Sequence, residues 1–303
     1  MRWVILSDDW PPQLGGVATW GFNRARQLAR EGHEVIVFAR QRPHLMAPEG
    51  VHLIGVPGPS FGRYGGVWTA VRALPELARA DRILATTWTV AAGIAGRIST
   101  PLEVVFHGSD VTRDPADARA FHRVCEAAER RWAVSDFLVQ TLANRGVKAE
   151  WTPSPLPDLE SGGGDPTGPW TFVGRATELK GGDRFVRLCA AAGRSGLVIG
   201  DGPALQSWTS LSRDLGAQIA FAGALPRRET WAQMWRSSRV FLLPRTHADG
   251  SGAEGLGLVL LEARAMDVQV VGCRCGGVPE ALGPSGVLLN DPDDVARSLE
   301  QLA

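Results

Sequence analysis

Lysine is almost missing from this sequence of 303 residues, although basic residues are not. Lysine and arginine together number 32, and only Lys148 and Lys180 are lysines. The 32 acidic residues bring the formal net charge to zero with histidine neutral, which argues against a protein that binds nucleic acid or another polyanion through its whole surface. Because lysine is so rare, its position in a glycine-bounded loop at Lys180 favours a function there.

Cysteine and long hydrophobic runs are also scarce. No apolar run reaches the ~18 residues of a membrane-spanning helix, and the run at 3–6 is too short for a signal peptide. We therefore expect a soluble, cytoplasmic protein. Its thiols should be reduced, because the cysteine spacing fits neither a zinc ribbon nor a disulfide framework. The four cysteines are Cys125, Cys189, Cys273 and Cys275.

Short buried strands alternate with helical segments in the first half of the chain. A strand, a loop containing Gly15-Gly16, a helix and a second strand open the sequence, and this βαβ order implies a parallel sheet. Residues 57–66 are rich in glycine and proline and are expected to form a loop. The expected strands are 3–6, 34–39, 82–86, 102–106 and 134–135, and the expected helices are 17–31, 67–80 (interrupted near Pro75), 90–98, 117–133 and 137–145.

A composition break follows, with prolines at 153–157 and glycines at 162–164. It predicts a domain of residues 1–157, a linker of 158–168 and a second domain of 169–303. Strands and helices alternate again in the second half, so we predict an α/β fold of two doubly wound, parallel-sheet domains that face each other across a cleft. The expected strands are 170–173, 197–199, 219–221, 239–243, 268–272 and 287–289, and the expected helices are 183–192, 204–215, 229–237, 258–266 and 292–302.

The stretch 253–263 is the centre of the functional prediction. It reads as a loop with glycines that leads into a helix, and Glu254 and Glu262 stand eight residues apart. Bare N–H groups at the helix start suit a phosphate, and Gly255 and Gly257 allow close backbone approach. The two carboxylates suit hydroxyl-rich groups joined to that phosphate, such as a ribose or a hexose. A capped helix with two solvated glutamates is the structural alternative.

Four loops of the second half should converge, because each follows a strand of one parallel sheet. Arg175 and Lys180 are their cationic members, and with the helix start at 255–257 they would clamp a pyrophosphate. The loops are 174–182, 200–203, 249–257 and 273–280.

The first half carries two further candidates. Gly15-Gly16 lies between a strand and a helix, where doubly wound folds bind ligands, but it does not form the fingerprint G-x-G-x-x-G, which argues against NAD there. His107 follows the buried strand 102–106 and is either a ligand-binding residue or a histidine bonded within its own loop.

These motifs resemble those of the GT-B-fold retaining glycosyltransferases of family 4, also called glycosyltransferases group 1. Glu254 and Glu262 match the E-x7-E signature of that family. The other matching pieces, in family order, are Pro11-Pro12 with Gly15-Gly16-Val17, His107-Gly108-Ser109-Asp110, Phe172-Val173-Gly174-Arg175 with Lys180-Gly181, Gly200-Asp201-Gly202-Pro203, Phe221-Ala222-Gly223 and Gly276-Gly277-Val278-Pro279-Glu280.

The resemblance implies a role for each matching residue. Arg175 and Lys180 would bind the donor diphosphate, Glu254 the sugar hydroxyls and Glu262 the ribose, while His107 would approach the sugar from the first domain. The residues implied in donor binding are Gly15, Gly16, Gly174, Arg175, Lys180, Gly202, Glu254, Gly255, Leu256, Gly257, Leu258 and Glu262. Those implied in catalysis are His107, Glu254, Arg175 and Lys180, and those on the acceptor side are Asp9, Trp10 and Asp110.

The implied activity is transfer of a sugar from a nucleotide sugar, UDP-linked in the first instance, to a small-molecule or glycolipid acceptor. Retention of configuration follows from the family alone. The arginine and lysine take the part that a cation would have, so we expect no essential metal and no other cofactor.

Three features keep alternatives open. Leu256 replaces the usual phenylalanine, residues 153–158 replace an Asn-Gly-Val-Asp-like segment, and no long helix follows 292–302. A GT-B epimerase or phosphorylase and a non-catalytic nucleotide-sugar-binding subunit remain the competing hypotheses.

A basic face on helix 117–133 would allow membrane contact, although its interleaved acids favour a solvated helix. The basic residues are Arg119, His122, Arg123, Arg130 and Arg131.

Overall fold

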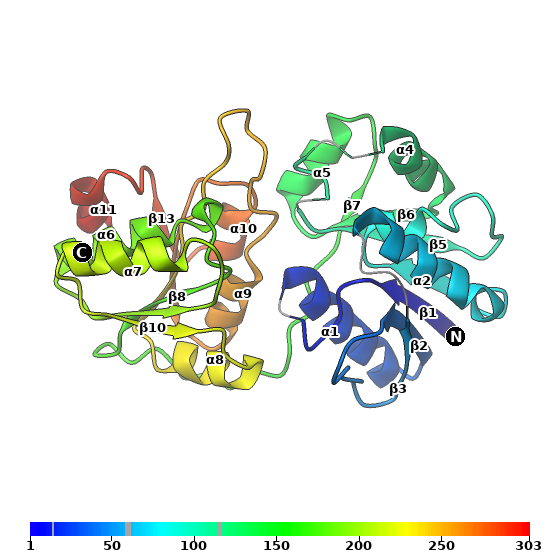
Figure 1. Ribbon diagram of the computed structural model, residues 1–303, viewed down its shortest axis with the longest axis horizontal. Helices are drawn as coiled ribbons and strands as arrows, with labels where there is room; N and C mark the ends of the chain where they lie inside the picture. The colour runs from blue at the N-terminus through cyan, green and yellow to red at the C-terminus, as the bar shows by residue number, and fades with distance from the viewer. Residues whose placement is uncertain (14, 58–61, 109, 114, 116) are drawn as a thin grey trace. The chain divides into compact units, whose positions relative to one another are not determined.

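The computed structural model describes the chain apart from residues 14, 58–61, 109, 114 and 116, and it describes residues 62–69 by their backbone alone. The chain forms two compact units, Met1–Pro157 and Asp158–Ala303 (Figure 1). The break between them falls inside the stretch rich in proline and glycine. Each unit is built on one parallel sheet, which confirms the predicted α/β class.

The sheet of the first unit has seven strands among the described residues, in the order β3-β2-β1-β4-β5-β6-β7, and all pairings are parallel. Strands β1 and β4 are neighbours from which the chain proceeds outward in opposite directions, so the strand order reverses there. The strands are β1 (Arg2–Ser7), β2 (Glu34–Arg40), β3 (Val51–Val56), β4 (Arg82–Ala85), β5 (Leu102–Phe106), β6 (Arg130–Ala133) and β7 (Glu150–Trp151). The helices are α1 (Gly16–Arg30), α2 (Gly62–Leu77), α3 (Trp88–Ala91), α4 (Ala118–Ala127) and α5 (Asp136–Ala143).

The second unit repeats this plan with a six-stranded parallel sheet in the order β10-β9-β8-β11-β12-β13. Its order reverses between β8 and β11, and open α/β sheets bind ligands outside the carboxyl ends of such strands. The strands are β8 (Trp170–Val173), β9 (Gly196–Ile199), β10 (Ile219–Gly223), β11 (Arg239–Leu242), β12 (Gln269–Cys273) and β13 (Val287–Leu289). The helices are the 3-10 turn η1 (Glu178–Lys180), α6 (Gly182–Ala192), α7 (Leu205–Asp214), α8 (Arg227–Trp235), α9 (Leu258–Ala265), α10 (Val278–Leu282) and α11 (Val295–Leu302).

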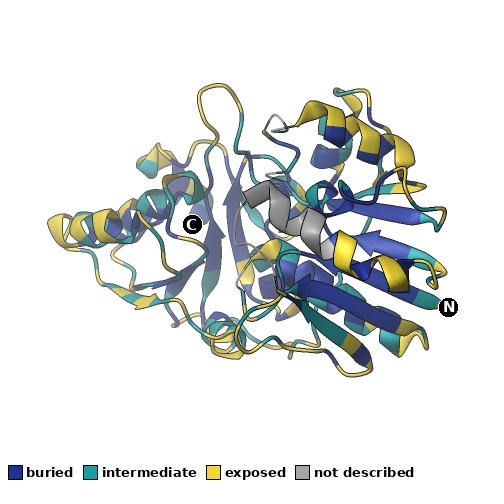
Figure 2. Cartoon of the chain, turned by 45° about the vertical axis from the view of Figure 1, so that its right-hand side comes forward, coloured by how far each residue is buried: buried dark blue, intermediate teal, exposed yellow. Residues whose placement is uncertain are grey.

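The cores follow from the apolar runs of the central strands. Every residue of β5 is buried, and so is all of β1 after Arg2. In Figure 2 the buried residues fill the central strands, and the exposed residues lie on the outer faces of the helices and in the loops. A parallel sheet that is covered on both faces requires apolar side chains on both, and such strands are therefore easy to find in a sequence.

Two strands, β3 and β7, are not predicted from the sequence, and both lie at the edges of the first sheet. Strand β3 is buried only at its two ends, and the two residues of β7 are exposed. Edge strands are covered less completely than central ones, so their apolar pattern is weak. Residues 58–61 of the loop predicted over 57–66 lie outside the described residues, and the prediction is wrong for 62–66, because α2 begins at Gly62. The helix predicted over 67–80 is not interrupted at Pro75, which lies inside α2.

The helix predicted over 117–133 ends early. Helix α4 stops at Ala127, and residues Arg130–Ala133 form β6, which pairs with β5. Strand β6 replaces the strand expected at 134–135. Arg131 donates hydrogen bonds to the backbone oxygens of Cys125 and Ala128, so it closes the turn between helix and strand. The continuous basic helix face is therefore wrong, since Arg130 and Arg131 do not belong to the helix.

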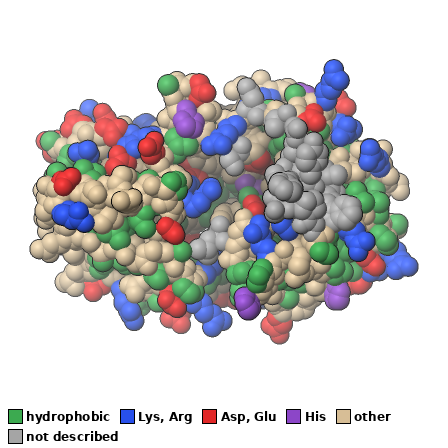
Figure 3. All heavy atoms as spheres, in the orientation of Figure 1, with side chains coloured by type: hydrophobic (Ala, Val, Ile, Leu, Met, Phe, Trp, Pro, Cys, Tyr) green, Lys and Arg blue, Asp and Glu red, His purple; other side chains and the backbone are tan. Residues whose placement is uncertain are grey.

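On the face of the molecule drawn in Figure 3, acidic and basic side chains are interspersed, as expected for a chain with no net charge. None of the helices in the described residues has both the length and the apolar composition needed to cross a membrane.

Candidate functional site

The predicted donor loops meet at the carboxyl edge of the second sheet. The loops after β8 and β9 are joined where the Ala176 amide donates to the Asp201 carbonyl at 2.9 Å. The loops after β11 and β12 are joined where the Gly277 amide donates to the Glu254 carbonyl, also at 2.9 Å. The Arg245 amide donates to the Leu179 carbonyl at 2.9 Å and connects the two pairs. The predicted convergence of the four loops is therefore present.

Glycines permit the close crossings of these loops. A Cβ atom on Gly200 would stand 1.9 Å from the carbonyl oxygen of Gly174, and one on Gly276 would stand 2.0 Å from that of Glu254. A Cβ atom on Gly202 would stand 2.5 Å from the carbonyl oxygen of Ala176. Gly276 also has a φ of +58°, a left-handed conformation that favours glycine. The loops are thus held by backbone contacts that only glycine allows.

Lys180 and Glu254 form an ion pair at this edge. Lys180 ends η1 in the connection that follows β8, and Glu254 lies in the loop after β11. The pair therefore joins the connections that follow the two strands where the strand order reverses. Both side chains are partly buried, with 27% and 16% of their surface exposed. The rare lysine therefore belongs to the predicted site. It is paired with the glutamate that the resemblance assigns to the donor sugar.

Arg175 lies two residues beyond β8 and is exposed. Its side chain has no ion-pair or hydrogen-bond partner in the part of the chain that the structure describes. An exposed guanidinium of this kind can bind a phosphate bidentately without first breaking an internal contact.

Helix α9 begins at this site after Gly257, and no side chain caps its first turn. Gly257 has a φ of +92°, and a Cβ atom there would approach Leu242 at 2.7 Å, so the residue suits only glycine. Gly255 and Leu256 are buried, and Leu258 is half-buried. The positive end of the helix dipole, Lys180 and Arg175 together favour an anion, while the carboxylate of Glu254 can accept hydrogen bonds from hydroxyl groups.

Glu262 is the second glutamate of the motif, and its side chain is only 7% exposed within α9. It pairs with Arg227, the first residue of α8. Arg227 is not among the residues predicted from the sequence. The one signal that could have found it is its position four residues beyond Gly223, where β10 ends at the same edge of the sheet.

The described residues contain no group of three or more histidines, cysteines or acids that could hold a metal ion. The expectation of no essential metal was also based on the absence of an Asp-x-Asp pair, and that premise is wrong, because the sequence contains one at Asp291-Pro292-Asp293. Asp293 is occupied by contacts with Arg184 and Arg245, which hold its pKa below the usual value.

In the first unit, His107 lies at the carboxyl end of β5 against the ring of Trp20, with 5.3 Å between the ring centres and an edge-on geometry. Its Nε2 is buried and has no hydrogen-bond partner among the described residues. Burial lowers the pKa of His107 to about 3, and a hydrogen bond to the Thr86 backbone opposes that shift. His107 is therefore a neutral imidazole at physiological pH with one unsatisfied ring nitrogen.

This pKa predicts how stability depends on pH. The unfolded chain takes up the His107 proton near pH 6.5, whereas the folded chain resists it down to about pH 3, so lowering the pH favours unfolding. As the pH falls from 6 to 4, the free energy of unfolding of the wild type should decrease, relative to that of His107→Gln, by about 1.4 kcal/mol per pH unit. Urea unfolding at each pH measures this difference, with the exposed His122→Gln as control. Parallel pH profiles for wild type and His107→Gln would contradict the assignment.

Asp110 organises the loop that contains His107. Its carboxylate accepts hydrogen bonds from the amides of His107, at 3.0 Å, and Gly108, at 2.7 Å. Burial raises the pKa of Asp110 to about 6, and these backbone hydrogen bonds oppose the shift. The carboxylate that was predicted to face an acceptor is thus engaged in shaping its own loop.

The other predicted residues of the first unit divide into buried and exposed positions. Trp10 is fully buried, and its Nε1 donates to the Met46 carbonyl at 2.9 Å, so it packs in the core beneath α1. Asp9 accepts a hydrogen bond from Gln13 at 2.6 Å and remains partly exposed. Gly15 and Gly16 are exposed at the start of α1, with open space where a Cβ atom of Gly15 would be.

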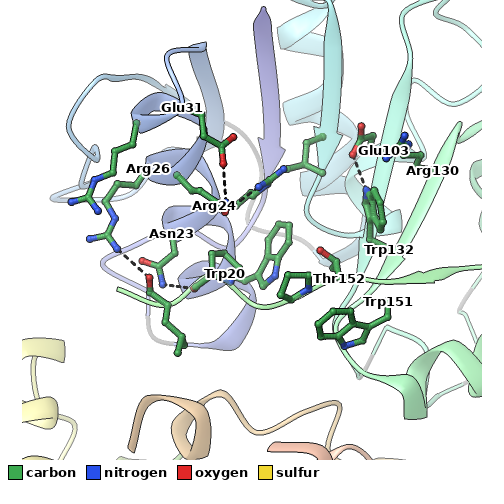
Figure 4. Close-up of a pocket in the computed structure, with 16 residues that line it drawn as sticks. Trp20, Asn23, Arg24, Arg26, Glu31, Glu103, Arg130, Trp132, Trp151 and Thr152 are labelled. Carbon is green, nitrogen blue, oxygen red and sulfur yellow. Dashed lines mark hydrogen bonds between the residues drawn. The ribbon is translucent and has the colours of Figure 1, made fainter. Parts of the chain in front are cut away.

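A pocket of about 730 Å³ lies elsewhere in the first unit, between α1, strands β4 to β6 and the segment 151–156 (Figure 4). Three tryptophans line it, Trp20, Trp132 and Trp151. At its floor, the Glu103 carboxylate accepts hydrogen bonds from Trp132 Nε1 at 2.7 Å and from Arg82 at 3.0 Å. None of the residues that the sequence analysis assigned to the site lines this pocket.

The two parallel-sheet units define a protein of the GT-B architecture. The whole chain superposes on a solved structure of Anabaena HepE in complex with UDP and glucose, with a TM-score of 0.72, 16% identity, and coverage of 99% of this chain and 90% of that one. A glycosyltransferase of avilamycin A biosynthesis matches with a TM-score of 0.69, 17% identity, and coverage of 99% and 88%. At these identities the likeness shows the fold alone.

Family models identify the chain more closely. The model described as Glycosyltransferase Family 4 matches residues 14–152, and the model described as Glycosyl transferases group 1 matches residues 170–303. The chain belongs to this family. Residues 153–169, which lie between the two matches, include the composition break.

Curated relatives agree with that assignment. A GDP-mannose-dependent phosphatidylinositol monomannoside mannosyltransferase of Mycolicibacterium smegmatis is 37% identical over 32% of this chain and 26% of its own length. The enzyme of the same description from Mycobacterium tuberculosis is 24% identical over 93% of this chain and 82% of its own length. A D-inositol 3-phosphate glycosyltransferase of Nocardiopsis dassonvillei is 33% identical over 43% and 34%. The stronger matches thus span only a quarter to a third of the relatives' length.

Proposed function

We propose that this protein is a glycosyltransferase that moves a sugar from a nucleoside-diphosphate sugar to a hydroxyl acceptor with retention of configuration. The observation that carries the proposal is the cluster of Lys180, Glu254, Arg175 and the uncapped start of α9 at one edge of the second sheet. It combines cationic groups for a diphosphate with a carboxylate for sugar hydroxyls.

The chemistry of this cluster suits loss of a nucleoside diphosphate. When the bond between sugar and phosphate breaks, negative charge grows on the diphosphate and positive charge on the sugar ring. Arg175, Lys180 and the helix start stabilise the leaving group as its charge develops. A front-side reaction, in which the departing phosphate accepts the proton of the acceptor hydroxyl, needs no carboxylate nucleophile and no metal ion.

Two donor nucleotides are consistent with the site and its relatives. We propose a UDP-sugar, and the relatives that are named as GDP-mannose-dependent make GDP-mannose the principal rival. We propose that the acceptor is either a small molecule or a glycolipid, since one relative is named for D-inositol 3-phosphate and others for phosphatidylinositol monomannoside. The role of His107 at the donor sugar stays a prediction.

A thermal-shift screen against UDP, GDP, ADP, dTDP and CDP, with and without attached sugars, tests the donor. A ligand that binds only the native state, at a concentration ten to a thousand times its Kd, raises the free energy of unfolding by about 1.4–4 kcal/mol. The nucleotide of the true donor should therefore raise the melting temperature clearly. The shift should persist in EDTA. A shift that disappears with EDTA would contradict metal independence, and no shift with any nucleotide would contradict the donor site.

Product analysis then separates the enzyme from its alternatives. The identified donor is incubated with inositol phosphate, phosphatidylinositol and alcohol acceptors, and the product's anomeric configuration is read by NMR. Transfer with retention supports the proposal. A changed sugar on an unconsumed nucleotide would favour an epimerase, and donor binding with no turnover on any acceptor would favour the non-catalytic subunit.

A further inference from the structure

Glu262, to which the family resemblance assigns the ribose, forms an ion pair with Arg227. Its carboxylate is almost fully covered inside the second unit, and Arg227 is the cation that the structure places against it. A buried carboxylate is strongly disfavoured unless an opposite charge and hydrogen bonds compensate it. The direction of the Glu262 side chain therefore depends on a residue from a different helix.

Arg227 is itself held in place from a second side. Its guanidinium lies over the ring of Trp231, 5.2 Å from the ring centre and one turn further along α8. The Trp231 Nε1 is buried with no partner among the described residues, so this ring is packed rather than free to turn in solvent. Arg227 is thus fixed between an aromatic face and a carboxylate, while about a third of its side chain, 34%, stays exposed.

The start of α8 lies at the same edge of the sheet as the donor loops. Strand β10 ends at Gly223, whose carbonyl accepts the Gly200 amide at 2.8 Å, and Gly200 belongs to the loop that is joined to the Arg175 loop. Helix α8 follows after three residues and packs beside α9. The pair of Arg227 and Glu262 is therefore a built part of the donor edge and not a distant surface contact.

We propose that Arg227 is a positioning residue for the nucleoside of the donor: it holds the Glu262 carboxylate in the orientation that accepts hydrogen bonds from the ribose hydroxyls. This inference rests on the proposed function, because only a nucleoside-diphosphate donor would bring to Glu262 the ribose that the family resemblance implies. Arg227 acts through Glu262 and need not touch the nucleotide. Its removal should therefore weaken binding only to the extent that the ligand offers hydroxyl groups to Glu262.

The test compares Arg227→Gln with the wild type by calorimetry. The ligands are the nucleoside diphosphate that gives the largest shift in wild type and its 2′-deoxy and 3′-deoxy analogues. We expect the variant to bind the ribonucleotide at least tenfold more weakly. At least one deoxy analogue, which has already lost the contact with Glu262, should lose less than threefold. Arg228→Gln is the matched control, because Arg228 is the next residue of the same helix and is exposed.

A double-mutant cycle with Glu262→Gln separates positioning from a general loss of structure. If Arg227 acts through Glu262, the variant with both changes should bind the ribonucleotide no more than threefold more weakly than Glu262→Gln alone. Thermal melting of each variant shows whether it folds.

Three results would overturn the inference. Unchanged binding by Arg227→Gln would remove the role, and an equal loss for ribose and both deoxy ligands would mean that Arg227 acts on the phosphates, the base or the fold. Additive losses in the cycle would mean that the two residues act independently. If wild-type protein binds no nucleoside diphosphate, the proposed function fails as well, which distinguishes that outcome from the other three.

Discussion

Replacing Arg175 with alanine is expected to lower kcat/KM for sugar transfer by roughly 10²–10³-fold, the usual effect of removing one preorganised contact to a developing charge. The residue is exposed and has no ion-pair partner among the described residues. Its loss therefore leaves no carboxylate unpaired, whereas the loss of Lys180 would leave the Glu254 carboxylate without its ion-pair partner. Initial rates with the identified donor measure the effect.

The control for Arg175→Ala is Arg187→Ala, an exposed arginine on α6 in the same unit. It removes the same charge without touching the loop after β8, so its kcat/KM should stay within about twofold of wild type. Because the diphosphate gains charge as the bond breaks, Arg175→Ala should reduce kcat/KM more than it reduces affinity for the intact nucleotide sugar. Equal activity of the two variants would exclude Arg175 from the site.

Replacing Gly276 with alanine is expected to disable donor binding through the backbone. The new Cβ atom would lie 2.0 Å from the Glu254 carbonyl oxygen, far inside van der Waals contact, so the Glu254 loop must move. The residue would also adopt a left-handed conformation that costs about 1–2 kcal/mol. We expect affinity for the nucleotide to fall at least tenfold, together with a lower melting temperature.

Gly193 provides a matched control, because its φ of +60° is close to the +58° of Gly276 and no atom lies within 4 Å of its virtual Cβ. Gly193→Ala therefore carries the conformational cost of about 1–2 kcal/mol without a collision. It should lower the melting temperature modestly and leave nucleotide affinity unchanged. If the two variants bind the nucleotide equally, the contact between the loops after β11 and β12 is not needed for the site.

The sequence was most informative about the second unit. All six of its predicted strands are present, since each is a short apolar run between glycines or charged residues. Its four predicted loops are joined, because the ends of parallel strands share one edge. The first unit was harder to predict at its edges. There, β3 is half covered, and β6 begins with two arginines whose contacts arise only in the fold.

By itself, the sequence determined the α/β class, the family and the residue types at the carboxyl edge of the second sheet, because apolar periodicity and glycine-rich motifs are local features. Only the tertiary structure decided which charges meet. It paired Lys180 with Glu254 and Arg227 with Glu262, across separations of 74 and 35 residues. It also buried Trp10 in the core and engaged Asp110 in its own loop. Burial and ion pairing depend on which strands are neighbours. The order β10-β9-β8-β11-β12-β13 arises from contacts between distant segments and cannot be predicted from any one of them.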